Sequence, residues 1–287
     1  MIINPYLNLD INAAARWQYG AQASVWPMPA HAYDWKARKP NDSTQYDLDL
    51  TGYVLATYGS NARLVLTGFG GDGWKIFRPF AQDWIVVPVI QVAKGLSRNP
   101  RAELDAITEA YYQNCLRVSE WYGSQCGGSG LAIARPTLFS SDKTPQQWQD
   151  LYISQADRYD TYKTVQADLL KAYGNRVNSS ILYVATQYCG PGADWDYDAA
   201  GGGWLTVVSS FATLHKYDPA RPSVRAQTAA YALAHEIGHC LGLAHTDPKL
   251  GDCTGIEKAL MQRGFPPSAV LVPYELDKVK TNPYLKR

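Results

Sequence analysis

The sequence predicts an α+β fold in which helices and a mixed sheet form α/β-like layers, preceded by an N-terminal β-rich region. The composition is that of an ordinary globular protein, with 46% hydrophobic and 18% charged residues in a chain of 287. From residue 84 onward, short apolar runs typical of buried strands alternate with long segments of helical periodicity. We therefore expect an accessory or prosegment-like region over residues 1–82 and a second domain over residues 83–287.

The N-terminal region is rich in Trp, Tyr, Asn, Asp, Gly and Pro, which is typical of a loop-rich β unit. Within it, residues 53–58 and 62–66 show the alternation that is typical of short strands. We expect these two segments to be strands.

The second domain is predicted to begin with a strand and a long helix. Residues 84–92 form an apolar run, and residues 100–122 follow an Asn-Pro start with apolar side chains at helical spacing. Another strand is expected at residues 131–134. A second long helix is expected to start at residues 141–145, which read Ser-Asp-Lys-Thr-Pro, and to run to about Tyr173.

The remaining elements lead to the last long helix that we predict. We expect a third strand at residues 181–186 and a fourth from Trp204 to Val208, after a turn at three glycines. A helix then opens at Pro222, with one side suited to burial. Gly242 is placed to end this helix, because glycine accepts the left-handed conformation that helix C-termini commonly need.

Charge and hydropathy argue against two classes of partner. The formal net charge is +1 and no run of Lys or Arg forms a basic stripe, so we expect no nucleic-acid partner. The longest apolar run, residues 84–90, is too short to span a bilayer and contains Pro88, so we expect no membrane partner. We expect a monomer.

The strongest pattern in the chain reads H-E-I-G-H-C-L-G-L-A-H over residues 235–245. His235 and His239 are four residues apart, so on a helix they lie one turn apart on the same face and can reach one ion. A sharp turn at Gly242 lets His245 swing back and complete a three-histidine site with one open position. The pattern therefore predicts Zn²⁺ bound by these three histidines.

Glu236 directly follows the first predicted ligand, so it projects beside the metal rather than onto it. Zinc lowers the pKa of a bound water toward about 7, and a neighbouring carboxylate can take its proton during attack on a carbonyl and pass it to the leaving amine. We assign Glu236 this catalytic role in a zinc-dependent endopeptidase. The alternative hypothesis is a non-catalytic, adhesin-type binding protein with a structural or vestigial zinc site.

The extended pattern resembles the active-site signature of the metzincin clan of zinc metallopeptidases. In that clan a methionine-containing turn lies beneath the zinc, and here Ala-Leu-Met places Met261 sixteen residues beyond His245. The resemblance implies a metzincin-like catalytic domain with a mixed sheet, two long helices before the active-site helix, and an edge strand that binds substrate antiparallel. We expect the strand from Trp204 to Val208 to be that edge and to pair with a protein or peptide substrate.

The resemblance also has departures and a weaker extension. Gln262 and Arg263 follow the methionine, so the tyrosine that astacins and serralysins place two residues beyond it is missing. Residues 69–72, Phe-Gly-Gly-Asp, resemble the Phe-x-Gly-Asp element of astacin-type prosegments, whose aspartate ligates zinc and keeps the enzyme latent. Asp72 is therefore a candidate latency switch, although a glycine-rich turn between strands explains the same residues.

Cysteine usage and the N-terminus bear on the compartment. The five cysteines are an odd number without paired clusters, so disulfides with a free thiol and a fully reduced set both stay open: Cys115, Cys126, Cys189, Cys240 and Cys253. A bridge between the last two would pin the loop that carries His245. The first residues show no secretory signal, so either the protein stays inside the cell or a leader has been removed. We expect a secreted or extracellular protein.

Overall fold

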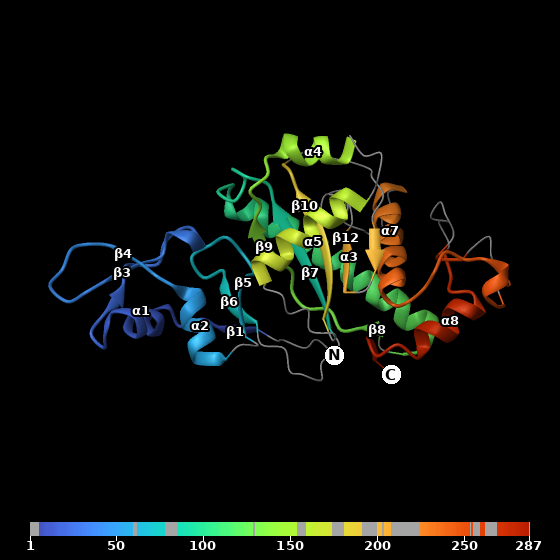
Figure 1. Cartoon of the computed structure of the whole chain (residues 1–287), viewed down its shortest axis with the longest axis horizontal. Helices are drawn as coiled ribbons and strands as arrows, with labels where there is room; N and C mark the ends of the chain where they lie inside the picture. Colours follow the sequence, from blue (N-terminus) through green and yellow to red (C-terminus); the bar gives the residue numbers. More distant parts are fainter. Residues whose placement is uncertain are drawn as a thin grey trace.

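A mixed sheet with helices on both faces forms the centre of the molecule (Figure 1). The computed structural model describes residues 6–59, 62–77, 85–128, 130–153, 159–173, 181–190, 200–202, 204–207, 224–252, 254, 259–261 and 269–286. This is the α+β class, with a mixed sheet and layered helices, that the sequence predicts. Among the described residues, no helix has the length and apolar character needed to cross a membrane.

Eight strands of the described chain form the central sheet, in the order β1-β6-β5-β9-β7-β10-β12-β11. β9, β7, β10 and β12 pair parallel, and the other neighbours pair antiparallel. In chain order the strands are β1 (Tyr6–Asn8), β5 (Arg63–Leu66), β6 (Trp74–Phe77), β7 (Ile85–Val92), β9 (Thr137–Ser140), β10 (Ile181–Tyr188), β11 (Ala200–Gly202) and β12 (Leu205–Val207).

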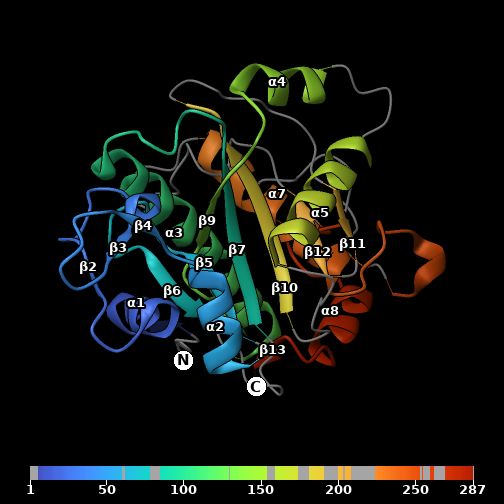
Figure 2. The same cartoon turned by 60° about the vertical axis from the view of Figure 1, so that its left-hand side comes forward.

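Helices cover both faces of this sheet, one pair on each face (Figure 2). The helices in chain order are α1 (Ile11–Tyr19), α2 (Leu50–Tyr58), α3 (Arg101–Cys126), α4 (Pro145–Ile153), α5 (Tyr159–Tyr173), α7 (Val224–Cys240) and α8 (Pro273–Lys280), with short 3-10 turns at Ala32–Asp34 and Pro248–Leu250. Alternate residues of β7 face opposite layers, as the period of a strand requires. Val86 and Ile90 pack in the core that includes α3 and α7, whereas Val87 packs with Trp148 of α4 and Leu169 of α5.

Most of the predicted elements of the second domain are present. β7, α3, β10 and α7 occupy the segments where the sequence predicts a strand or helix. The single helix expected from residue 141 to Tyr173 is instead described as two, α4 and α5, and residues 154–158 lie outside the described residues. The segment expected as a strand at 131–134 begins in β8 (Gly130–Leu131), which pairs with β13 (Leu285–Lys286), and it continues to Ile133, which forms a parallel bridge with Val86 of β7.

The strand predicted at residues 53–58 is wrong, because this segment is helix α2. Asp49 caps the helix by accepting a hydrogen bond from the Gly52 backbone N–H at 2.7 Å. Tyr53 and Val54 are buried on the helix, so the apparent alternation reflects a helical face. The neighbouring prediction at residues 62–66 is confirmed as β5.

The predicted edge strand also needs correction. The segment from Trp204 to Val208 contains β12, but β12 pairs with β10 on one side and with β11 on the other. The edge strand on this side of the described sheet is therefore β11, which includes Gly201 and Gly202, and β1 is the edge strand on the other side. Glycines suggest a turn when they are judged locally, but pairing with β12 makes these two part of a strand.

The N-terminal region contributes directly to the central sheet. β1 pairs with β6, β6 with β5, and β5 with β9, so three strands from residues 1–82 extend the sheet of the later residues. The same region contains α1, α2 and a separate sheet of β2 (Ser24–Val25), β3 (Lys36–Arg38) and β4 (Tyr46–Asp47). It is thus a mixture of helices and strands, and a domain boundary near residue 82 stays a prediction.

Candidate metal centre

Three histidines converge at the end of α7. His235 and His239 come from the helix and His245 from the loop that follows it. One ligand nitrogen from each lies within 4.8 Å of the other two, and the ring centroids are 4.9 to 5.4 Å apart. The described residues contain this one group of side chains able to hold a metal ion.

Backbone carbonyl groups orient the two helical imidazoles. Nδ1 of His235 lies 2.8 Å from the Leu260 oxygen, and Nδ1 of His239 lies 2.9 Å from the Leu243 oxygen. A carbonyl oxygen only accepts hydrogen bonds, so each Nδ1 carries the proton and donates it. Each Nε2 is then left with the lone pair that a metal ion requires.

Gly242 ends the helix in the conformation that redirects the chain. Its φ is +91°, in the left-handed region that glycine favours. Its backbone N–H donates to the His239 carbonyl at 3.0 Å, and the Leu243 N–H donates to the Gly238 carbonyl at 2.9 Å. These two bonds are those of a Schellman motif. The motif turns the chain directly after the helix and so places the loop that brings His245 to the other two histidines.

The methionine turn lies against the same helix, and this explains Gly238. Met261 is fully buried, and a Cβ added at Gly238 would lie only 2.7 Å from its sulfur atom. The Met261 carbonyl accepts a hydrogen bond from the Thr246 N–H at 3.2 Å. The sequence pattern left the Gly238 position unspecified. The sequence could still have indicated its role, because Gly238 lies inside a predicted helix. A glycine there costs about 1 kcal/mol of stability relative to alanine, so a packing reason is expected.

Tyr122 of α3 lies against the same face of the helix as Met261, since its hydroxyl oxygen would be 3.3 Å from a Cβ added at Gly238. Its hydroxyl group donates to the Ala234 carbonyl at 2.8 Å, next to the first ligand. Burial, followed by the nearby Glu275 carboxylate, raises the pKa of Tyr122 well above its ordinary value. The phenol therefore stays a hydrogen-bond donor throughout the physiological pH range. Sequence reasoning missed this residue, because the two partners are 112 positions apart.

Glu236 is a buried carboxyl group beside the first ligand. It lies on α7 and is 4% exposed. Protein therefore shields this side chain from bulk water, and its catalytic role stays a prediction.

The structure does not bring Asp72 to the histidines. Asp72 lies in the turn between β5 and β6, and its carboxylate forms an ion pair with Arg101 of α3 at 3.1 Å. A Cβ at Gly73 would overlap the Gly68 carbonyl oxygen, so local packing accounts for a glycine here. This arrangement is the glycine-rich turn between strands that the sequence also allowed. A latency role for Asp72 stays a prediction without support from this geometry.

The predicted disulfide cannot be judged, because Cys253 lies outside the described residues. The sulfur of Cys240 lies 3.4 Å from the Leu205 carbonyl oxygen, which places the end of α7 against β12. Cys115 and Cys189 are buried free thiols, and burial raises the pKa of Cys189 to about 12. A Cys240–Cys253 bridge stays a prediction.

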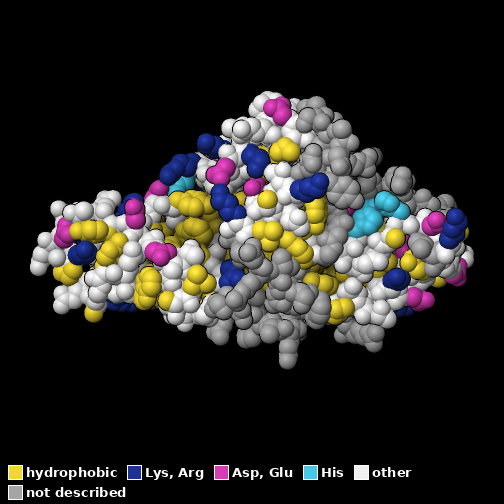
Figure 3. Space-filling model, in the orientation of Figure 1, with side chains coloured by type: hydrophobic (Ala, Val, Ile, Leu, Met, Phe, Trp, Pro, Cys, Tyr) yellow, Lys and Arg dark blue, Asp and Glu magenta, His cyan; other side chains and the backbone are white. Residues whose placement is uncertain are grey.

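The metal centre is open to solvent through the His245 side. This side chain is exposed, His239 is partly exposed and His235 is buried. Figure 3 shows histidine side chains at the surface beside α7. The open side gives an extended molecule access to the ion position, whereas the helix and the methionine turn close the opposite side.

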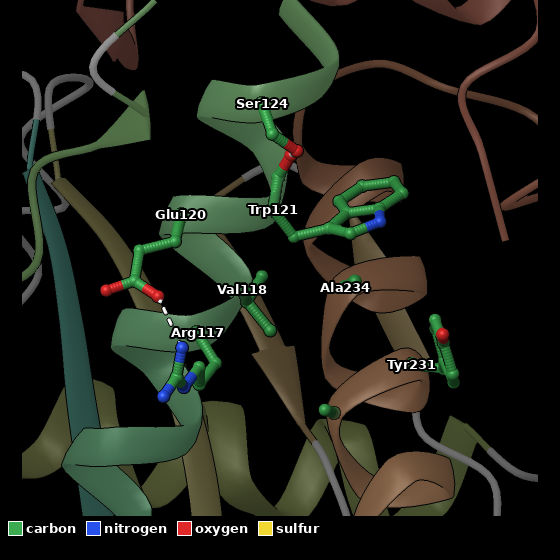
Figure 4. A pocket seen from close by; sticks show the side chains of 8 residues that line it. Arg117, Val118, Glu120, Trp121, Ser124, Tyr231 and Ala234 are labelled. Carbon is green, nitrogen blue, oxygen red and sulfur yellow. Dashed lines mark hydrogen bonds and ion pairs between the residues drawn. The ribbon is translucent and has the colours of Figure 1, made fainter. Parts of the chain in front are cut away.

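A separate hollow of about 330 Å³ lies between α3 and α7 (Figure 4). Its walls include Trp121 and Val118 from α3 and Tyr231 and Ala234 from α7. The described residues that line the hollow do not include His235, His239 or His245. The hollow is therefore distinct from the metal centre, although both border the same helix.

Comparison with known proteins gives distant likenesses only. No protein-family model matches the chain, and no curated protein matches its sequence. Among solved structures, OgpA from Akkermansia muciniphila is 14% identical, with 73% of this chain and 63% of that chain covered and a TM-score of 0.43. Its catalytically inactive form, in complex with an O-glycopeptide substrate, gives 16% identity, 71% and 62% coverage and a TM-score of 0.42. The chain thus spans less than two thirds of OgpA.

Archaemetzincin from Methanopyrus kandleri is a further likeness, at 19% identity, with 71% of this chain and 90% of that chain covered and a TM-score of 0.30. Because these TM-scores and identities are low, the likenesses do not decide what the site does. The interpretation of the site therefore depends on its own geometry. The extended signature, the three converging imidazoles and the buried methionine turn together form a candidate metal site that resembles those of metzincins.

Proposed function

We propose that the chain is a zinc-dependent endopeptidase. The observation that carries this proposal is the convergence of three imidazole nitrogens within 4.8 Å, two of them on rings whose Nδ1 atoms donate to backbone carbonyls. Neutral imidazoles suit zinc, and three protein ligands with one remaining position are typical of catalytic rather than structural zinc. The donor set of this chain therefore fits the metal.

Glu236 acts as the proton carrier in this proposal. When bound, zinc provides a Lewis acid that polarises a carbonyl group and makes water more acidic. The Glu236 carboxylate accepts the proton of the attacking water, holds it at a carboxylate oxygen and releases it to the leaving amine. Its burial keeps bulk water from competing for that proton during the reaction.

In this proposal the substrate lies along β11. This strand is an edge strand of the described sheet and contacts α7, the helix that bears two of the histidines. The free edge of a sheet offers backbone N–H and C=O groups to an extended peptide, and side-chain pockets then set the preference for its sequence. Recognition through the main chain favours an endopeptidase that acts on extended segments of proteins.

Substitution of Glu236 by glutamine tests this function. The change keeps the size of a buried side chain but removes the base, so we expect kcat to fall by about 10² to 10⁴ while the zinc content stays at that of the parent. Digestion of a mixed peptide library, measured by mass spectrometry, gives activity and specificity, and elemental analysis gives zinc. Glu120→Gln on α3 is the control, because this carboxylate is exposed and forms an ion pair with Arg117 of the same helix.

The same experiment separates the proposal from the binding-protein alternative. A zinc-loaded parent protein that cleaves no peptide in the library would favour a non-catalytic zinc site. Equal activity of the parent and Glu236→Gln would remove Glu236 from the mechanism.

A further inference from the structure

We propose that Glu275 is a positioning residue for the third metal ligand, acting through Thr246. This inference rests on the proposed zinc site and extends it to the C-terminal helix. Glu275 is fully buried in the first turn of α8, far along the chain from the histidine motif. No part of that motif includes it.

The Glu275 carboxylate joins three separate segments. One oxygen accepts hydrogen bonds from the Thr246 hydroxyl at 2.6 Å and from the Met261 N–H at 3.2 Å. The other accepts from the N–H of Val272 at 3.2 Å, at the start of α8. The loop after His245, the methionine turn and the C-terminal helix therefore meet at one side chain, which we call the Glu275 cluster.

Burial makes this arrangement specific. A carboxylate without contact to water is costly unless hydrogen bonds compensate for its lost hydration. Here three donors converge on it, and the N-terminal end of a helix favours negative charge at this place. Displacement of the Thr246 loop would remove the shortest of these bonds, so the buried carboxylate resists movement of that loop.

Two of the three ligands lie on a helix and the third on the loop after it, and this makes the anchoring of that loop important for the metal. His235 and His239 lie on a regular helix and donate to backbone carbonyls. His245 is exposed and belongs to a loop that residue Thr246 ties down through its N–H to Met261 and its hydroxyl to Glu275. The Glu275 cluster therefore fixes the loop directly beside the third ligand.

Substitution of Thr246 by valine is the mildest test, because it removes the hydroxyl group and keeps the shape. We expect the zinc affinity of Thr246→Val, measured by competition with a chelator, to fall about 10-fold to 100-fold, as is usual when the partners of ligands are lost. Thr246→Ser keeps the hydroxyl group and should bind zinc as the parent does. The visible spectrum of the cobalt(II)-loaded protein should change in the valine variant and not in the serine variant.

Glu275→Gln tests the other partner, and Asp277→Asn is its matched control, since Asp277 lies exposed on the same helix. We expect the glutamine change to lower zinc affinity and the control to leave it unchanged. If Thr246 and Glu275 act as one unit, Thr246→Val should lower the zinc affinity much less in the Glu275→Gln protein than in the parent protein. Thermal unfolding of the metal-free proteins shows whether each variant is folded.

Each of the following outcomes would overturn the proposal. Folded Thr246→Val with the zinc affinity and cobalt spectrum of the parent would show that the hydroxyl group does not position the ligand. If the two substitutions lower the zinc affinity additively, Thr246 and Glu275 act independently of each other. If the parent itself binds no zinc, the proposed function fails and this inference fails with it; if the parent binds zinc and both variants bind it equally well, only this inference fails.

Discussion

Two segments of the chain attract attention for the same reason, yet they differ in the structure. The segment over residues 235–245 and the turn over residues 69–73 both combine glycines with a side chain that can bind a metal. In the first, the three imidazoles converge within 4.8 Å of one another. In the second, Asp72 pairs with Arg101 of α3 instead.

The difference shows how much a pattern must specify before it predicts chemistry. The histidine segment sets several independent requirements: a helical pair, a left-handed glycine and a third ligand at a defined distance along the chain. Residues 69–72 and Gly73 meet only the requirements of a tight hairpin. A side chain at position 73 would overlap the Gly68 carbonyl oxygen, so local packing already explains the glycine there. Each prediction below therefore changes one of these two segments.

The largest effect is expected for His245→Ala. If three ligands share a binding free energy of about 12 kcal/mol, losing one costs about 4 kcal/mol, on the order of a thousandfold in zinc affinity. Chelator competition measures this directly. His31→Ala, in the N-terminal region, is the control and should bind zinc as the parent does, since His31 is not part of the histidine cluster. Retained zinc affinity in His245→Ala would refute the three-histidine site.

An intermediate effect is expected for Gly238→Ala. Alanine normally favours a helix, but here its Cβ would press on the Met261 sulfur at 2.7 Å, so we expect a loss of about 1 to 3 kcal/mol in unfolding free energy. Zinc affinity should fall as well, because the turn that bears the Leu260 carbonyl must shift. Gly73→Ala should lower thermal stability without changing zinc affinity. A Gly238→Ala protein more stable than the parent would contradict this packing.

The smallest effect is expected for Asp72→Asn. The ion pair with Arg101 is largely exposed, so its loss should change the unfolding free energy by less than about 1 kcal/mol. Peptidase activity should stay within about twofold of the parent, because the carboxylate does not reach the histidines. A rise of activity well beyond this, measured with the same peptide library, would instead support the latency switch.

The sequence allowed the ligands to be predicted because their geometry is encoded within eleven residues. It also allowed β7, α3, β10 and α7 to be placed, since their apolar periodicity is long and regular. Short elements were harder. In α2 an apparent alternation hid a helical face, and its signal was the cap formed by Asp49. In β11 the glycines suggested a turn until pairing with β12 was known.

The supports of the site were beyond prediction for a different reason. Tyr122 and Glu275 bond to Ala234 and Thr246, the chain neighbours of two ligands, across long separations along the chain. No local sequence pattern marks such partners. Glu275 left one signal: it is the third residue of a helix that starts with Pro273, where a glutamate commonly accepts from the backbone. That signal indicates a helix start, but it does not reveal the Thr246 hydroxyl or the methionine turn.

The position of the Glu275 cluster has a consequence for the protein while it is being made. A ribosome that has just added His245 has delivered every ligand, but Met261, Glu275 and the strand β13 that pairs with β8 are still to be translated. At about 5 to 20 residues per second, this delay lasts on the order of seconds. During that interval the nascent chain has its histidines but lacks the residues that fix the third one. Under the proposed function, peptidase activity would therefore arise only after these later residues have been translated.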